Sequence, residues 1–432
     1  MNKQVELKMK LSPDQEEALS NIKLLLTDTH REQVLTGSPG TGKSYLTAMV
    51  IQLARKARYE VVLAATTHAA SKVMADFTQS KVVTLHKLLD LKVLNAYQTN
   101  TVETVQSITK KGPYINQLVR RNSPTLLIID EASYIDEEMY GYISDMLTRQ
   151  KSIVILYVGD ADQLPPIGSD QPYIFTLDKP TSTLTTDHRF AADSQMASIV
   201  TTLKTNIQTE NYLLTDIVEG KEITLLDAPA FKQKMLELYL TDEYKADPYY
   251  VKSIAFRNTV VDKMNMYIRS SFYDSPEYQV GERLVVNSAL IRKRKLLANN
   301  GDVVTVLRNT ATELNGITGQ NLHLQNGLDS FYAIVTNQKV QKNKERKRLA
   351  KLSFPQLYQF MESFIDVKSI YSSTIHKAQG ASYTNVMLNL DDLVECTDHV
   401  ILARLLLVAV SRAREHVYVY GTVPSHLMKR AS

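Results

Sequence analysis

The chain has 432 residues, of which 44% are hydrophobic and 22% charged, and its formal net charge is +4. This length predicts roughly two to four domains. No stretch approaches the roughly 18 uninterrupted apolar residues of a membrane helix, and the first residues lack the apolar segment of a signal peptide. The single cysteine, Cys396, cannot form a disulfide within the chain. These features predict a chain without a membrane span in a reducing cytoplasm, and any nucleic-acid surface must be local because the total charge is small.

The first half of the chain has the pattern of a strand-helix repeat. Short apolar runs are typical of buried parallel strands at 33–37, 60–66, 125–130 and 152–160. Residues 43–57, between the first two runs, carry apolar side chains at helical spacing. The pattern predicts an α/β unit with a parallel sheet covered on both faces.

The second half predicts another α/β unit, with candidate strands at 253–256, 385–390, 405–410 and 417–421. Short strands and turn signals such as Asn300-Gly301 separate the first of these strands from the others and indicate a small β insertion. A basic run and an amphipathic segment follow at 339–364. Residues 87–122 indicate a hairpin insertion in the first unit.

A phosphate-binding loop is the most specific motif. Residues 37–44, GSPGTGKS, have the G-x-x-x-x-G-K-[ST] spacing between a predicted strand and a predicted helix. Such loops direct backbone N–H groups and a helix N-terminus at phosphate oxygens. We expect Lys43 to reach the β- and γ-phosphates and Ser44 to ligate Mg²⁺. The predicted nucleotide-binding residues of the loop are Gly37, Ser38, Gly40, Thr41, Gly42, Lys43 and Ser44.

Two further polar groups follow predicted strands of the same sheet. Asp130 is placed to hold the metal and Glu131 to activate the attacking water, whereas an isolated acidic pair would be an ordinary solvated turn. Gln163, in the loop after the next strand, is a candidate γ-phosphate sensor, or part of a purely structural Gln-Leu-Pro-Pro turn.

The order of segments resembles the motif series of superfamily 1 DNA helicases, in the 5′-to-3′ branch that is RecD-like. The resemblance covers nearly the whole chain and rests on LSPDQEEA (11–18), GSPGTGKS (37–44), LAATTHAASK (63–72), VVTLHKLL (82–89), LLIIDEAS (126–133), VGDADQLPPIG (158–168), LTTDHRF (184–190), STIHKAQGAS (373–382) and LLLVAVSRARE (405–415).

The resemblance implies roles for residues that spacing alone does not assign. Gln15 would read adenine, Arg189 and Arg412 would be arginine fingers, and Gln379 with Gly380 would face the nucleotide. We place Arg412 at the end of a second-unit strand. The DNA track would be formed by Thr67, His68, Thr84, His86, Thr374, His376 and Lys377.

Two insertions leave alternatives open. The family carries an aromatic residue on its strand-separating hairpin. This chain offers Tyr97 and Tyr114 for that role, or it separates the strands with an aliphatic wedge instead. The basic run from Lys342 to Lys351 is either a solvated helix face or a surface that contacts DNA or braces the small β insertion.

The segment before the Thr-His pair departs from the family pattern, because this chain has Thr66 where related chains have proline.

The expected architecture is two RecA-like P-loop domains with parallel sheets, a small hairpin insertion and a small β-barrel-like (SH3-like) insertion. The expected limits are 1–86 and 123–190 for the first domain, 87–122 for the hairpin, 191–285 and 369–432 for the second domain, and 286–368 for the β insertion.

The expected function is that of a monomeric, ATP- and Mg²⁺-dependent DNA helicase moving 5′-to-3′ on single strands. The alternative is a translocase or RNA helicase that remodels protein or RNA without unwinding DNA. A switch that binds ATP without hydrolysis has no need of Glu131 and two arginines. Expected partners are single-stranded and forked DNA, with replication or recombination proteins as candidates, in the cytoplasm of a bacterium or phage-infected host.

Overall fold

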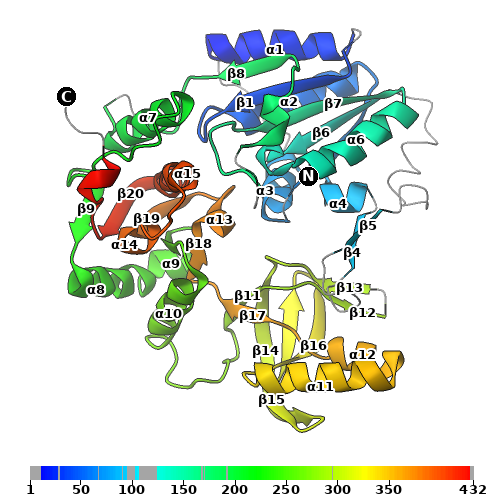
Figure 1. Ribbon diagram of the computed structural model, residues 1–432, viewed down its shortest axis with the longest axis vertical. Coiled ribbons are helices and arrows are strands. Elements are labelled where there is room, and N and C mark those ends of the chain that lie inside the picture. The colour runs from blue at the N-terminus through cyan, green and yellow to red at the C-terminus, as the bar shows by residue number, and fades with distance from the viewer. Residues whose placement is uncertain are drawn as a thin grey trace.

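The computed structural model describes residues 11–27, 30–66, 68–89, 91–94, 103–106, 124–166, 169, 171–190, 193–293 and 295–428. Two parallel sheets and one antiparallel sheet organise the chain (Figure 1). The predicted fold class, two RecA-like α/β domains with two small antiparallel insertions, is confirmed. Among the described residues, no helix combines the length and apolarity needed to cross a bilayer.

The first unit is a six-stranded sheet in which all pairs are parallel. Its strands in spatial order are β3 (Val82–Thr84), β2 (Glu60–Ala65), β6 (Thr125–Asp130), β7 (Ile153–Gly159), β1 (Glu32–Gly37) and β8 (Thr181–Leu184). Its helices are α1 (Pro13–Leu25), α2 (Lys43–Lys56), α3 (His68–Thr78), α4 (Leu85–Leu88) and α6 (Glu137–Arg149), with 3₁₀ turns at Ala132–Tyr134 and Tyr173–Thr176. The central strands are mostly apolar because helices cover both faces of the sheet.

The second unit is a five-stranded parallel sheet. Its strands in spatial order are β18 (Ser372–Thr374), β10 (Val251–Ala255), β19 (Tyr383–Asn389), β20 (Ala413–Tyr420) and β9 (Ile223–Leu226). Its helices are α7 (Gln195–Gln208), α8 (Ala228–Tyr239), α9 (Asp242–Ala246), α10 (Asn258–Arg269), α13 (Ile375–Ala378), α14 (Leu390–Leu393) and α15 (His399–Val410), with a 3₁₀ turn at Ser425–Leu427.

The strand predicted at 405–410 is wrong, because these residues form the last half of helix α15. Asp398 caps this helix by accepting a hydrogen bond from the backbone N–H of Ile401 at 3.1 Å. The run is apolar on every side because α15 is buried from Leu402 to Val410, and a helix buried all round lacks the polar face that reveals a helix in the sequence. Arg412 therefore follows a helix, and not a strand.

The β insertion is an antiparallel sheet of β16 (Asp329–Val335), β15 (Ile317–Asn326), β14 (Val303–Leu314), β11 (Arg283–Val286) and β17 (Val367–Ser369), with a hairpin of β12 (Leu290–Arg292) and β13 (Lys295–Ala298). Helices α11 (Lys339–Leu352) and α12 (Phe354–Met361) lie along one side of it (Figure 1). The domain limits at 286 and 368 stay a prediction, as do the other limits.

The hairpin insertion contains the antiparallel pair β4 (Leu91–Leu94) and β5 (Glu103–Gln106). The candidate aromatics Tyr97 and Tyr114 lie outside the described residues.

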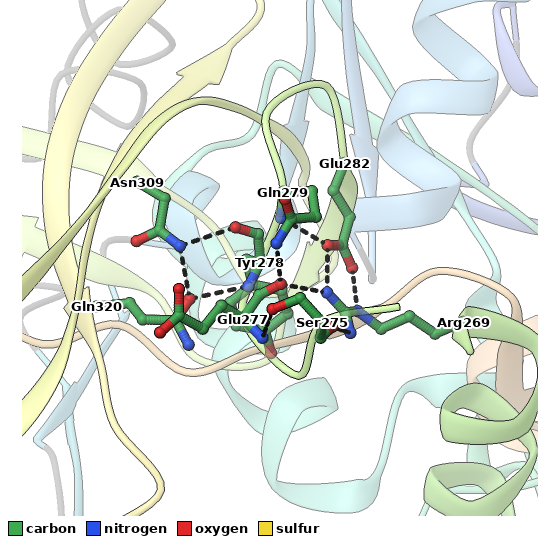
Figure 2. A network of polar contacts seen from close by, with 8 residues as sticks. All are labelled: Arg269, Ser275, Glu277, Tyr278, Gln279, Glu282, Asn309 and Gln320. Atoms are coloured by element: carbon green, nitrogen blue, oxygen red, sulfur yellow. Dashed lines mark hydrogen bonds and ion pairs between the residues drawn. The ribbon is translucent and has the colours of Figure 1, made fainter. Parts of the chain in front are cut away.

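A polar network joins the β insertion to helix α10 of the second unit (Figure 2). Arg269 and Glu282 form a bidentate pair at 2.7 and 2.9 Å, and the Glu282 side chain is 1% exposed. Tyr278, which lies between them and the sheet, donates its backbone N–H to Gln320 Oε1 at 2.8 Å and accepts from Asn309 Nδ2 at 2.8 Å. A buried, fully hydrogen-bonded ion pair resists separation, so these contacts fix the insertion to α10.

Candidate active site

The phosphate-binding loop joins β1 to α2, and its glycines are required by its shape. Gly40 and Gly42 have φ values of +100° and +85°, in the region that side chains disfavour. A Cβ atom on Gly40 would lie 2.7 Å from Asp187 Oδ1, and one on Gly42 would overlap Gln15 Nε2. Gly37 is similarly enclosed, because a Cβ atom there would lie 2.8 Å from Leu184 O. The loop therefore keeps backbone N–H groups close to any bound phosphate.

The Lys43 ammonium lies within the curl of this loop. Its Nζ donates to the carbonyl oxygens of Gly37 at 2.6 Å and Ser38 at 2.8 Å. Burial lowers the pKa of Lys43, and the nearby carboxylates of Asp160 and Glu131 oppose that shift. The loop also has internal support, because Thr41 Oγ1 donates to Ser38 O at 2.9 Å.

Gln15 lies against the phosphate-binding loop and is 4% exposed. Its Nε2 donates to Thr41 O at 3.0 Å and contacts His188 Nε2 at 3.1 Å. Its Oε1 accepts from the Ser12 N–H at 3.2 Å, at the start of α1. The structure thus brings the predicted adenine-reading residue to the predicted phosphate site.

The acidic pair ends β6 in a strained turn. Glu131 has a φ of +53°, which is uncommon for a residue with a side chain and often marks a functional position. Its N–H donates to Asp130 Oδ1 at 3.0 Å, and its carbonyl accepts from Thr66 Oγ1 at 3.0 Å. Burial, together with the neighbouring Asp130 carboxylate, raises the pKa of Glu131 to about 7. Burial also raises the pKa of Asp130.

The predicted sensor Gln163 connects the two units. Its Nε2 donates to Asp160 Oδ2 at 3.0 Å, and its Oε1 accepts from Gln379 Nε2 at 2.8 Å. Gln379 Oε1 in turn accepts from the Tyr134 hydroxyl at 2.6 Å. The next residue, Gly380, is so close that a Cβ there would lie 3.3 Å from Glu131 Oε1. The HKAQG segment of the second unit therefore bonds the predicted sensor and lies beside Glu131 of the acidic pair.

The two predicted arginine fingers lie beside each other at this junction. Arg189 Nη1 donates to Ser411 O at 2.5 Å. Arg412 is 2% exposed and donates to the carbonyls of Ala381 at 3.0 Å and Val408 at 3.1 Å. Burial and the nearby Arg412 guanidinium lower the pKa of Arg189 to about 10. Burial lowers the pKa of Arg412, and the carboxylate of Glu131 opposes that shift.

Three residues at the junction were not predicted. Tyr134 contacts Gln379 as described above, and Lys204 on α7 bonds Ser38 Oγ of the phosphate-binding loop. Arg404 on α15 is 6% exposed and donates through Nη1 to Ala161 O at 2.9 Å and Gln163 O at 2.8 Å. The sequence did contain a signal for Arg404, which is the charged residue inside the apolar run LARLLLVAV. A charged side chain is almost never buried without a partner, so its position predicts a polar contact.

Thr84 and Thr374 occupy matching positions in the two units. Each ends an edge strand, β3 or β18, and caps a short helix by accepting a backbone N–H at 3.3 Å, from Lys87 or Lys377. A hydroxyl that accepts such a bond keeps its own hydrogen for donation. The repeated T-[LI]-H-K pattern therefore offers a hydroxyl hydrogen from each sheet.

The other track candidates differ in how the structure places them. Burial lowers the pKa values of His86 and His376, so both rings are neutral near pH 7. Lys377 is exposed and its Nζ donates to Asn287 Oδ1 of the β insertion at 2.9 Å. His68 begins α3, and Thr67 lies outside the described residues.

The chain is similar in sequence to known helicases. Residues 10–222 match a family described as AAA domain, and residues 369–420 match the UvrD-like helicase C-terminal domain. The ATP-dependent DNA helicase dda of enterobacteria phage T4 is 23% identical over 454 residues, covering 94% of this chain and 98% of the relative. The chain resembles the superfamily 1 helicases of the 5′-to-3′ branch.

Other relatives agree with this placement. The ATP-dependent RecD2 DNA helicase of Deinococcus radiodurans is 34% identical over 164 residues, which is 38% of this helicase and 20% of the relative. The fold matches a Pif1 helicase from Candida albicans with a TM-score of 0.54 and 17% identity, over 98% of this chain and 97% of that one. A Bacteroides Pif1 helicase, solved with ADP-AlF3 and single-stranded DNA, has a TM-score of 0.55, 16% identity and coverages of 98% and 95%.

Proposed function

We propose that this helicase hydrolyses ATP at the junction of its two units and uses that reaction to move 5′-to-3′ along single-stranded DNA and unwind duplex DNA. The observation that carries the proposal is the position of Gly380 of the second unit, where an added Cβ atom would lie 3.3 Å from Oε1 of Glu131 in the first unit. The guanidinium of Arg412, also in the second unit, is near enough to lower the pKa of Glu131 against the effect of burial. A site that both units complete makes hydrolysis depend on their relative position, which is what a motor requires. The direction of movement rests on the resemblance to the 5′-to-3′ branch.

In this proposal Glu131 takes a proton from the attacking water, and Lys43, Arg189 and Arg412 stabilise charge on the γ-phosphoryl oxygens. The loop N–H groups orient the phosphates. Gln15 contacts the adenine, a role supported by its position beside Thr41.

Ser44 and Asp130 would hold Mg²⁺, and the pair suits a hard cation through its oxygen donors. Ser44 is exposed in the first turn of α2. The pKa of Asp130 is raised because burial opposes its negative charge, and a bound cation would offset that cost. The ion supplies positive charge to the β- and γ-phosphates.

The structural change caused by hydrolysis would be transmitted to the DNA-binding residues through the hydrogen bonds that join Asp160, Gln163 and Gln379. Gln379 directly follows α13, the helix that Thr374 caps. A change at Gln163 therefore displaces the short helix that carries Thr374, His376 and Lys377. These residues, with Thr67, His68, Thr84 and His86, are proposed to contact the phosphates of one strand.

The first test compares ATP turnover in two variants on single-stranded DNA. Lys43→Ala should abolish turnover and leave single-strand binding intact, because the hydrogen bonds that Lys43 donates to described residues go to carbonyls of the phosphate-binding loop and not to the proposed DNA track. Arg412→Ala should lower kcat by roughly a hundredfold or more with little change in nucleotide affinity, as the loss of a transition-state donor does. Equal losses in kcat and affinity for Arg412→Ala, or unchanged turnover for Lys43→Ala, would contradict the assignment.

A further inference from the structure

The positive charge of this helicase is concentrated in the β insertion. Residues 286–368 contain thirteen Lys and Arg against six Asp and Glu, whereas the whole chain has 50 against 46. The rest of the chain therefore carries more acidic than basic residues. Local charge of one sign sets the long-range attraction for charged partners, so the insertion is the part of the chain that attracts a polyanion.

Within the insertion, helix α11 collects cations on its outer face. Lys344, Lys347, Arg348 and Lys351 line one hollow together with Leu352. Their spacing of three and four residues places them on one side of the helix. The single acid of this helix, Glu345, pairs with Arg348 at 2.6 Å, and the three lysines form no ion pair with any of the described residues.

The opposite face of α11 packs against the rest of the β insertion, and the four outer cations take no part in this packing. Leu349 is buried with Leu357, Phe360 and Phe364 in a small core against the sheet. Lys342 Nζ lies 4.6 Å from the centre of the Phe364 ring. The inner side of the helix thus braces the β insertion, and the outer cations take no part in that packing.

The outer cations lower the stability of the helix that carries them. Like charges three and four residues apart repel each other, and Lys339 and Lys342 near the N-terminus oppose the helix dipole. An external anion would relieve this repulsion. The hollow is lined by cations and one leucine, without the aromatic platform on which single-strand sites stack bases.

We propose that the outer face of α11 binds the phosphate backbone of double-stranded DNA, at a site separate from the single-strand track. Contacts of this kind are independent of sequence. The 14-residue helix spans roughly 21 Å, and the Arg269–Glu282 network fixes the insertion to the second unit (Figure 2). A duplex on α11 would therefore be held in a defined place relative to the motor. The role at a fork rests on the proposed helicase function, whereas the binding itself needs no ATP.

The test uses a blunt DNA duplex without single-stranded tails. The variant combines Lys344→Gln, Lys347→Gln and Lys351→Gln, which leaves the Glu345–Arg348 pair intact. The matched control combines Lys23→Gln, Lys56→Gln and Lys151→Gln, three exposed lysines of the first unit. Fluorescence anisotropy gives the duplex affinity of each protein over a range of salt concentrations.

The α11 variant should bind the duplex about tenfold more weakly than the control at low salt, and the slope of log K against log salt should fall by roughly 2.7, the value for three lost phosphate contacts. Binding of a short single strand and the ATPase activity it stimulates should match the control. Equal duplex affinity and slope in the two variants would overturn the proposal. A parallel loss of single-strand binding would also overturn it, and would implicate Phe354 and Tyr358, which are exposed on α12. Absence of ATPase in the unmodified protein would refute the proposed function and leave the duplex measurement interpretable.

Discussion

The ionisation of Glu131 should control ATP turnover as a function of pH. Its pKa is raised to about 7 because the carboxyl group is buried beside Asp130. Below that pH the group is protonated and cannot accept a proton from water. The value of kcat/KM for ATP, which reports the free enzyme, should rise about tenfold per pH unit up to about pH 7 and level off above it. Steady-state rates at saturating single-stranded DNA measure this profile.

Glu131→Gln is the control for the pH profile. It should give a low rate without the rise between about pH 5.5 and about pH 7, because no ionisation of a base remains. A level profile in the unmodified helicase over the same range would contradict the role of Glu131.

Thr66 links a segment assigned to the DNA track with Glu131, the proposed catalytic base. Its hydroxyl donates to Glu131 O at 3.0 Å, and its N–H donates to Asp130 O at 3.3 Å. A proline at this position could make neither bond. The hydroxyl bond helps to hold Glu131 in its left-handed conformation, so its loss is expected to let the carboxylate move from its place.

Thr66→Val should therefore lower kcat by about fivefold, the equivalent of one hydrogen bond of about 1 kcal/mol. Thr66→Ser should retain the rate because it keeps the hydroxyl. The DNA concentration for half-maximal stimulation should stay unchanged in both variants. A shift in that concentration without a change in kcat would instead place Thr66 in direct contact with DNA.

At the residue scale, the sequence predicted the side chains that ATP hydrolysis requires, but not the residues from the other unit that contact them. The phosphate-binding loop, Asp130 and Glu131 follow from spacing, because a phosphate site needs those residue types after a strand. Tyr134, Lys204 and Arg404 escaped prediction because each acts across the junction, on a partner at least 166 residues away in the chain. Contacts between such distant segments leave no local pattern.

At the scale of elements, helix α15 contains the residues that were wrongly predicted as a strand, and it also connects the second unit to the sensor loop of the first. A short apolar run fits a buried strand or a buried helix equally well, and only the cap at Asp398 distinguishes them. Through Arg404 this helix holds the carbonyls of Ala161 and Gln163 in the sensor loop. We expect α15 to transmit the state of the sensor to the second unit.

Arg404→Met should consequently uncouple hydrolysis from movement. It removes two buried hydrogen bonds from a charged donor, each of which contributes about 1.5–3 kcal/mol. The number of base pairs unwound per ATP hydrolysed should fall roughly tenfold, with a smaller fall in DNA-stimulated ATPase. Arg404→Lys, which keeps one charged donor, should recover part of the coupling. Equal losses of ATPase and unwinding would indicate that Arg404 serves only to stabilise the fold.

At the scale of the whole molecule, two units with parallel sheets meet at the proposed catalytic site. A buried ion pair connects the basic β insertion to the second unit. The sequence predicted the two units because the strand-helix pattern is local. It did not predict the Arg269–Glu282 ion pair, because the two residues are 13 positions apart and the loop between them brings them together without a periodic pattern. Movement of the second unit should carry the insertion, and any duplex on α11, with it.

The most direct test of the central claim is an unwinding assay on partial duplexes that carry either a 5′ or a 3′ single-stranded tail. With ATP and Mg²⁺, the helicase should displace the strand from the 5′-tailed substrate, and Lys43→Ala should be inactive. An RNA duplex of the same form tests the alternative substrate. Unwinding only of the 3′-tailed substrate would contradict the direction, and DNA-stimulated ATPase without displacement of any strand would contradict the helicase activity itself.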